Sequence, residues 1–546
     1  MRQPPIREAR GPGAWLAAVV ICLACPATNL AQSVSPAPAA VIDSVVLQRQ
    51  DVFARTDEIN PIKAFLNEIH ATTKPFVIRR ELLFAPGTAH DSALFAESER
   101  NLRALGLFRS VRLDTASVGG RLVATVRTRD AWSLQPRAAV RVASDGRLTG
   151  SVGLTETNFG GTGNRLRLWY VRQADRDGLV FSASAGRIGR SRLGTGVSRT
   201  SLSDWSSWYW FGGRSFASFS DRWSVYYEGE TFTGRLSQYR TLSIAERDTA
   251  DWHRRAFINR GFVTFAPIAN PREYVRMGAS AEVRREEYIP FPIAPVELDS
   301  VFGLVPDTVY GLLGAFAEYR RARYQRVDRL NGFTEEDQDL SDLVFVSVKL
   351  AAKGLGYAST GVGARVRLQT GARLGRATAK GLVDANGLFN AAGLDSGRVF
   401  ARGTLAVKPH DRHATFLQVT GGVLDRPPPG GEFDLGFEIL PRLWGPHAFV
   451  GTRSLSATFE HRIFIATNVA DLVGAGVAGF VDYGGAWYAD QDTRFGGNAG
   501  LSVFFGSPLS SFAQVTHVSG GYRFGGGLSE SEEPRWAFSL GSGIRF

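Results

Sequence analysis

The side chains that could catalyse a reaction or bind a metal are scattered through this sequence. His410 and His413, beside Pro409, are the only close pair among eight histidines. Two histidines without an acidic or cysteine companion at helical spacing make a poor zinc site. We therefore expect a solvated turn at this pair, and no metal centre.

The signatures of nucleophilic catalysis and phosphate binding are also missing. The sequence contains no Gly-x-Ser-x-Gly elbow for a serine nucleophile. The glycines of residues 160–163 lack the lysine of a phosphate-binding loop and fall in an expected turn between strands. We expect Asp130, Glu156 and Glu460 to be charges in the lumen or at the rim of a β-barrel, rather than an acid–base pair. The prediction is that the chain is not an enzyme and uses no cofactor.

The first residues predict export. Arg2, Arg7 and Arg10 precede an apolar stretch at residues 14–24, and small residues follow up to Ala31. This is the order of charge, apolar core and cleavage site in a secretory signal peptide. We predict a signal peptide at residues 1–31 and a short linker at 32–40. Cys25, which follows the apolar core, leaves lipid attachment open as an alternative.

Cysteine content and charge limit the remaining classes of protein. The 546 residues include two cysteines, Cys22 and Cys25, so cleavage after Ala27 or Ala31 leaves no disulfide and no thiolate metal site. The formal net charge is +11, but the basic residues are spread along the chain. Nucleic-acid binding would require a basic stripe on a recognisable module. We therefore expect no nucleic-acid partner.

Residues 41–130 predict a small α/β domain. Runs of β-branched and aromatic residues predict strands at 41–47, 76–84, 111–113 and 122–126, the last two joined by a turn at 119–120. Apolar residues at helical spacing predict helices near 65–69 and over 91–107. Asp91 is a suitable cap for the first turn of the second helix, and Gly106 can end its last turn.

Residues 131–546 predict a transmembrane antiparallel β-barrel. Alternating strands are separated by clusters of Gly, Asp, Asn and Pro, and no helical periodicity persists. At 165–170, for example, apolar residues at 166, 168 and 170 alternate with arginines. The array is too long for a sandwich, and aromatic residues gather near strand ends as they do at membrane interfaces. Closure is expected because an open sheet edge in lipid would leave backbone groups unpaired.

Together, the two parts resemble the BamA/TamA family of outer-membrane assembly factors, in which polypeptide-transport-associated (POTRA) domains precede a barrel. The resemblance covers nearly the whole mature chain. It is carried in the small domain by Val77-Ile-Arg-Arg-Glu-Leu-Leu-Phe84, residues 97–103 and Leu107-Phe108-x-x-Val111. Residues 156–164 are similar to the family's first-hairpin motif, and residues 536–546 to its C-terminal β-signal. The resemblance implies one POTRA-like periplasmic domain and a barrel of 16 strands.

One family motif lies at the tip of a long loop that folds back into the barrel lumen. The family carries Arg-Gly-aromatic at this tip, followed by Phe-x-Gly. Here Arg442-Leu443-Trp444 is followed by Phe449-Val-Gly451 at the matching spacing. Leu443 replaces the glycine, and leucine resists backbone angles that glycine permits. This departure puts the family's tip conformation in question.

A second motif, Phe-x-Asp-x-Gly, is intact as Phe480-Val-Asp482-Tyr-Gly484. The resemblance implies that Asp482 pairs with Arg442 inside the barrel. The strand pattern supports this pairing independently, because Asp482 falls on a face rich in glycine, opposite the Val/Tyr/Trp face assigned to lipid. A forked guanidinium on a carboxylate is well matched in geometry and charge.

The last strand predicts a weak seam with the first barrel strand, at about 132–142. Its lipid-facing residues are expected to be Trp536, Phe538, Leu540, Ile544 and Phe546, and its other face contains Gly541 and Gly543. Glycines weaken a strand because they lose more entropy and pack no side chain. An opened seam would offer unpaired N–H and C=O groups to another strand.

We therefore predict an outer-membrane assembly factor that assists the insertion and folding of β-barrel proteins. The expected partners are unfolded outer-membrane proteins, the lipid bilayer and periplasmic accessory proteins. A two-partner-type secretion pore is the main alternative, although that class has two periplasmic domains and usually an N-terminal plug helix. A passive porin-like barrel, which would give steady conductance and have no client, and a lipid exporter remain open because a fold does not fix a function.

Overall fold

The computed structural model describes residues 40–546 apart from 55–59, 143–147, 174–175, 242–246, 291–307, 358–359, 429, 437–438, 446, 471, 511–514, 527–534 and 544–546. The expected signal peptide and all but the last residue of the expected linker lie outside the described residues. Val41–Phe546 form one compact unit. None of the described helices has the length and apolar character needed to cross a bilayer.

The described part of residues 41–130, called here the α/β domain, contains a three-stranded sheet and three α-helices. The elements are β1 (Ile42–Gln50), α1 (Pro61–Ile69), α2 (Pro75–Arg79), α3 (Ser92–Ala104), β2 (Phe108–Val118) and β3 (Arg121–Asp130). The sheet order is β1-β3-β2, with β1 parallel and β2 antiparallel to β3. Asp91 caps α3, as expected, by accepting a hydrogen bond from the Ala93 N–H at 2.7 Å.

The strand expected at 76–84 is wrong, because this stretch begins with helix α2 and continues without strand. Pro75 stands at the start of the helix, where its fixed φ is suitable and its missing N–H is not needed. Val77 and Ile78 are adjacent and both fully buried. A strand with one buried face would have turned one of them to solvent.

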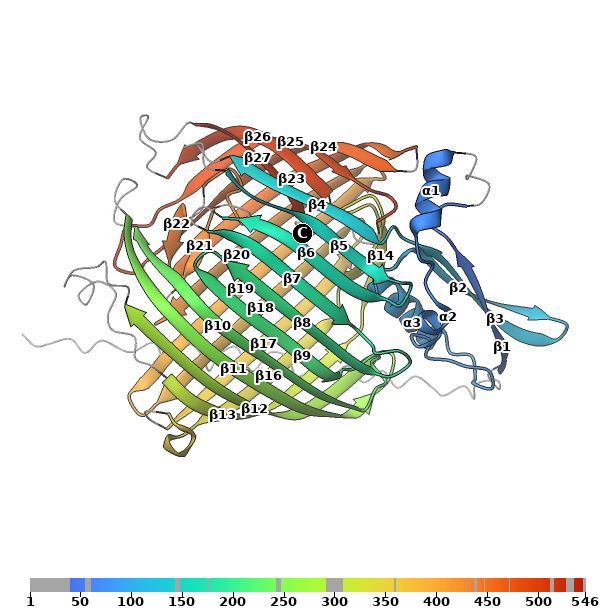
Figure 1. The fold of residues 1–546 in the computed structure, drawn as a ribbon, viewed down its shortest axis with the longest axis horizontal. Coiled ribbons are helices and arrows are strands. Elements are labelled where there is room, and N and C mark those ends of the chain that lie inside the picture. The colour runs from blue at the N-terminus through green and yellow to red at the C-terminus, as the bar shows by residue number, and fades with distance from the viewer. Residues whose placement is uncertain are drawn as a thin grey trace, which may run out of the picture. The chain divides into compact units, whose positions relative to one another are not determined.

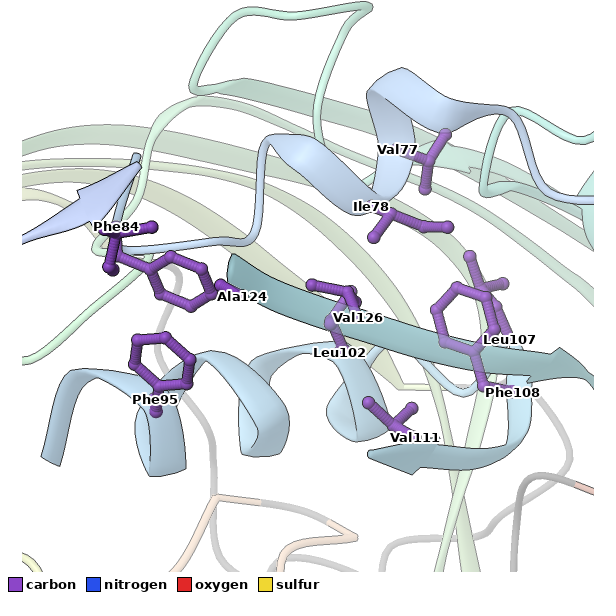
Figure 2. Close-up of a cluster of buried hydrophobic side chains, with 11 residues drawn as sticks. Val77, Ile78, Phe84, Phe95, Leu102, Leu107, Phe108, Val111, Ala124 and Val126 are labelled. Carbon is purple, nitrogen blue, oxygen red and sulfur yellow. The ribbon is translucent and has the colours of Figure 1, made fainter. Parts of the chain in front are cut away.

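The core of the α/β domain joins helices α2 and α3 to the sheet (Figure 2). The rings of Phe84 and Phe95 stack with centroids 3.9 Å apart and an interplanar angle of 6°. Leu102 of α3 and Val126 of β3 are at most 1% exposed and belong to the same cluster. The apolar side of α3 read from the sequence is therefore the side that packs.

The rest of the described chain forms a closed antiparallel barrel (Figure 1). Its strands before the long loop are β4 (Leu134–Val142), β5 (Leu148–Phe159), β6 (Asn164–Arg172), β7 (Asp177–Ala185), β8 (Leu193–Leu202), β9 (Trp205–Arg214), β10 (Trp223–Thr241), β11 (Arg247–Ala269), β12 (Glu273–Pro290), β13 (Thr308–Arg321), β16 (Asp342–Ala351), β17 (Gly361–Leu374), β18 (Ala377–Asn390), β19 (Gly393–His410) and β20 (His413–Asp425). After it come β23 (Arg453–Val469), β24 (Val473–Trp487), β25 (Gly496–Gly506), β26 (Val515–Gly525) and β27 (Trp536–Gly543).

The barrel order among the described residues contains twenty strands, so the expected sixteen is wrong. The physical reason is that several strands are short: β4, β6 and β7 have nine residues each. A tilted strand of about 9–11 residues is sufficient to cross a bilayer. The same length of chain therefore makes more strands than the family's pattern implied.

Strands β23 and β24 each have an apolar outer face, as the alternation predicts. On β23, Leu455 and Phe459 are 45% and 47% exposed, whereas the intervening Ser456 and Thr458 are buried. On β24, Val481 and Tyr483 are exposed and Asp482 is fully buried. The polar faces of these strands therefore line the barrel interior.

In the described part of the chain, two small hairpins and one short 3-10 helix lie between barrel strands. β14 (Tyr324–Asp328) pairs with β15 (Glu335–Asp339) between β13 and β16. β21 (Phe433–Leu435) pairs with β22 (Phe449–Gly451) within residues 426–452, which we call the lumen loop. A single 3-10 turn, Lys353–Leu355, follows β16.

Candidate functional site

The tip of the lumen loop is buried inside the barrel. Arg442 is 6% exposed, and Leu443 and Trp444 are each 3% exposed. A charged side chain loses its hydration at such a position and needs an opposite charge and hydrogen bonds in return. The surroundings of Arg442 supply both.

The structure brings Arg442 and Asp482 together, as the two motifs predict. The Nε and Nη2 groups of Arg442 donate to the two oxygens of Asp482 at 2.7 and 2.9 Å. The backbone N–H of Arg442 donates to the same carboxylate at 3.1 Å. The guanidinium also lies over the ring of Phe480, 4.0 Å from its centroid. The pair is therefore bidentate, and an aromatic face adds to it.

Sequence reasoning missed a second buried pair that continues from the first. Arg442 Nη1 also donates to Glu460, and the other oxygen of Glu460 accepts from Arg462 Nε at 2.6 Å. Glu460 and Arg462 are both fully buried. Two arginines and two carboxylates thus form one network in which opposite charges alternate, which lowers the cost of burying each charge.

A signal for this network was present in the sequence. Thr458, Glu460 and Arg462 alternate along one strand, so they share a face. In the observed register Thr458 lies opposite Asp482, and Glu460 lies opposite Phe480. Thr458 also donates to Asp482 at 2.7 Å and accepts from Arg442 at 3.1 Å. Alignment of β23 with β24 in the correct register would have predicted these contacts. The sequence of either strand alone does not give that register.

Leu443 occupies the tip without a strained backbone. It is not among the non-glycine residues with positive φ in the described chain. Its N–H donates to Asn498 Oδ1 at 3.1 Å, and Asn498 Nδ2 donates to Asp482 at 2.8 Å. Replacement of the family's glycine therefore does not prevent the Arg442–Asp482 contact.

Trp444 and Phe449 anchor the loop to the neighbouring strands. Trp444 Nε1 donates to the carbonyl of Gly497 at 3.1 Å, and its ring lies 4.9 Å from that of Phe449. A Cβ at Gly496 would lie 2.5 Å from both rings. Arg523 of β26 stands over Trp444 at 5.7 Å. With Glu460 on β23 and Asp482 on β24, the tip thus contacts four consecutive strands.

The two motif glycines are required by close approach. A Cβ at Gly451 would overlap the backbone of Trp487, and one at Gly484 would lie 2.7 Å from Cβ of Ser456. Neither position leaves space for a side chain. These glycines fix how closely the loop and strand β23 approach β24.

The C-terminal strand has the exposed face that was predicted, in the part that is described. Trp536 and Phe538 of β27 are 65% and 71% exposed. Gly541 and Gly543 lie in the strand, while Ile544 and Phe546 lie outside the described residues. Leu540 pairs with Val518 of β26, which is itself exposed.

The junction of β27 with β4, which closes the barrel, is called here the seam. The described part of β27 has eight residues, so it can form only a short ladder with β4. By contrast, β10 has nineteen residues and pairs with β11 along its whole length. Among the described residues, the seam is therefore one of the shorter junctions of the barrel.

The first-hairpin motif holds the α/β domain against the barrel. In the β5–β6 turn, the carbonyl of Gly161 accepts from the Lys74 N–H at 2.9 Å. Asn158 donates to Thr73 Oγ1 at 2.9 Å, and Thr73 donates to Asp130 through its N–H and hydroxyl at 2.7 and 2.8 Å. Asp130 also lies 3.1 Å from His70 Nε2. Asp130 is thus a structural carboxylate at the domain junction.

Two buried glutamates of the α/β domain reach other turns of the barrel. Glu97 accepts from the Phe219 N–H at 2.6 Å, and Glu81 pairs with Arg187 at 2.8 Å. Burial raises the pKa of both carboxyls, although the Phe219 hydrogen bond and Arg187, respectively, oppose the shift. These contacts attach the domain to the β9–β10 and β7–β8 turns.

His413, one of the two histidines singled out in the sequence, lies among neutral neighbours in the structure. Among the described residues, no three His, Cys, Asp or Glu side chains gather as metal ligands would. His413 instead lies 3.1 Å from His461, which in turn lies 2.8 Å from Thr415. The buried charges of the lumen are engaged with one another and suit the fixing of a loop.

No family model and no curated protein matches this chain. Among solved structures it is similar to BamA from Haemophilus ducreyi lacking POTRA domains 1–3, with 12% identity, a TM-score of 0.38, and coverage of 92% of this chain and 84% of that one.

It is also similar to CdiB from Acinetobacter baumannii, at 10% identity and TM-score 0.43 over 92% of this chain and 74% of that one. CdiB from Escherichia coli gives 9% identity and TM-score 0.45 over 94% and 92%.

Proposed function

We propose that this protein lies in the outer membrane, with its α/β domain in the periplasm, and assists the insertion of other β-barrels. The apolar outer face of the barrel supports the membrane location, because such a face is stable only in lipid. The signal-peptide pattern supports export. The α/β domain would act as a POTRA-like module that receives unfolded clients.

The observation that carries the proposal is the brace formed by the lumen-loop tip. Through Arg442, Trp444 and their partners, the tip holds β23, β24, β25 and β26 together. These are the four strands that precede β27 and the seam. A brace on this side lets the barrel stay intact while the short seam opens.

An open seam would work by β-augmentation. The free N–H and C=O groups of β4 or β27 would pair with a client strand, which completes its hydrogen bonds inside the membrane. Gly541 favours opening, because a glycine adds nothing to the cross-strand packing that stabilises a sheet. A Cβ there would meet no atom within 4 Å, so the glycine is not required by space.

The competing proposal is a pore through which the client passes along the lumen. The brace by itself is also compatible with a pore, because a gated channel can likewise hold a loop inside its lumen. The two differ in what they do to a membrane: an insertase speeds the folding of a barrel client, whereas a pore carries a soluble one across.

The test is client insertion in proteoliposomes. Wild type, Arg442→Ala and the control Arg453→Ala, an exposed residue at the start of β23, are mixed with an urea-unfolded outer-membrane protein. Protease-protected folded client is followed over time. We expect acceleration by wild type and Arg453→Ala, and its loss with Arg442→Ala. No acceleration over empty liposomes, together with steady conductance, would replace the proposal with the pore.

A further inference from the structure

The β14–β15 hairpin, residues 324–339, enters the barrel from the side opposite to the lumen loop. It follows β13 and precedes β16, at the end of the barrel where the β5–β6, β7–β8 and β9–β10 turns meet the α/β domain. Its tip is buried: Leu330 and Asn331 are 3% exposed and Phe333 is 6% exposed. Neither its position nor its burial was expected from the sequence.

The tip packs against the inner faces of strands on the far side of the lumen. Phe333 meets Phe464 of β23 edge-on at 5.3 Å and lies 5.7 Å from Phe504 of β25. Leu330 belongs to the same buried cluster, which also includes Phe416 of β20. A Cβ at Gly474 of β24 would overlap the Phe333 ring, so that glycine forms its seat. The tip therefore fills part of the lumen that would otherwise be open.

The hairpin has its own internal support. Glu336 accepts from the backbone N–H groups of Leu330, Asn331 and Gly332 at 3.1, 2.6 and 3.1 Å, and from Asn331 Nδ2 at 2.9 Å. One carboxylate thus holds the whole turn in a fixed conformation. A hairpin built in this way can move as a unit without losing its shape.

The outer end of the hairpin is clamped by the α/β domain. Arg103 donates to both oxygens of Asp337 at 2.7 and 3.0 Å, and Arg112 to both oxygens of Glu335 at 3.1 and 3.0 Å. Arg326 of the hairpin pairs with Glu99 of α3. Bidentate arginine–carboxylate pairs fix orientation as well as distance. Displacement of the domain would therefore pull on the hairpin.

The inner end joins the buried network of the lumen loop. Arg462 Nη1 donates to the carbonyl of Asn331 at 2.8 Å, and its Nε donates to Glu460, which holds Arg442. A continuous polar path therefore links the α/β domain, the hairpin, strand β23 and the lumen loop. A change at one end can reach the other through these contacts.

We propose that the β14–β15 hairpin is a lumen plug, and that the α/β domain controls its release through Arg103 and Arg112. Client binding to that domain would weaken the clamp, withdraw the tip from its seat on Gly474 and loosen the Arg462–Glu460–Arg442 path. The regulation rests on the proposed function, but the plug itself does not, because occlusion of the lumen can be measured without a client.

The test is ion conductance in planar lipid bilayers. The clamp is reversed with Glu335→Arg/Asp337→Arg and restored with Arg103→Glu/Arg112→Glu in the same chain. The reversal is expected to raise the open fraction roughly tenfold, and the restored chain to return toward wild type. Arg127→Glu, which breaks an exposed pair with Asp114 inside the α/β domain, is the matched control and should leave conductance unchanged.

A second variant tests the plug with the clamp intact. Gly474→Leu fills the seat of Phe333 and should open the lumen, whereas Gly403→Leu, at a β19 position with no atom within 4 Å of a Cβ, should not. Barrel folding is checked by heat-modifiable gel mobility. Wild-type conductance in a folded Gly474→Leu barrel overturns the plug. An open Gly474→Leu barrel with no response to clamp reversal overturns control by the α/β domain.

The insertion assay separates this inference from the proposed function. If the protein inserts clients but the variants do not change its conductance, the proposed function stands and the plug is refuted. If the conductance responds as described but no client is inserted, the plug stands and the proposed function is refuted.

Discussion

Replacement of Arg442 with alanine is expected to destabilise the folded protein strongly. The side chain is 6% exposed and serves two carboxylates. After the substitution Glu460 still has Arg462, but Asp482 is left with neutral partners such as Asn498. Removal of one partner of a buried ion pair costs about 3–5 kcal/mol, because the other charge stays in a poorly solvated place.

A second substitution identifies the cause. Adding Asp482→Asn to Arg442→Ala removes the stranded charge while keeping an amide that can bond to Thr458. The double variant should therefore be more stable than the sum of the two single variants predicts, with a coupling energy of about 2 kcal/mol. A purely steric effect of losing the arginine would give no such coupling.

The assay is urea unfolding of the protein in lipid vesicles, followed by heat-modifiable mobility on a gel. Arg453→Ala, at an exposed position at the start of β23, is the control and should resemble wild type. If the free energy of unfolding of Arg442→Ala lies within about 1 kcal/mol of the wild-type value, the proposed network is refuted. About 1 kcal/mol is the average effect of any point substitution. Strict additivity of the double variant would refute the charge argument.

Three further predictions concern other parts of the chain. Phe333→Ala should cost about 3–5 kcal/mol in the same unfolding assay, because it leaves a cavity among packed aromatic rings. Burial raises the pKa of Glu97, so its favourable contribution is present below the unfolded pKa and is lost as pH rises through the folded pKa. Glu97→Gln, which keeps an acceptor for the Phe219 N–H, should abolish this pH dependence and raise stability at neutral pH; unfolding midpoints across the acidic to neutral range measure it. Gly541→Val should strengthen the seam and slow client insertion, whereas Gly403→Val, with equal space on β19, should leave the insertion rate unchanged.

The sequence allowed the faces of the barrel strands to be predicted, because alternation is a local property. The outward Leu455 and Phe459 and the inward Asp482 all followed from their own strands. The Arg442–Asp482 contact was also foreseeable, because two motifs far apart in the chain implied one pair. The role of Glu460 was not predicted, because one of its partners, Arg442, comes from a loop whose path no strand pattern reveals.

Other features depended on three-dimensional packing that no local pattern reveals. The predicted strand count was wrong because short strands such as β6 and β7 take part in the barrel with only nine residues each. Helix α2 was wrongly predicted as a strand, because five residues starting at a proline give too little periodicity to distinguish a helix from a strand. The plug hairpin was invisible because Phe333 and Gly474, which define its seat, are more than a hundred residues apart.

The measurement that tests the central claim most directly is the folding rate of an unfolded outer-membrane protein into vesicles with and without this protein. The vesicles are made of lipid in which unassisted folding is slow. The account predicts that protease-protected client accumulates faster with wild type and that Gly541→Val removes most of the gain. Equal rates with wild-type protein and with empty vesicles would contradict it.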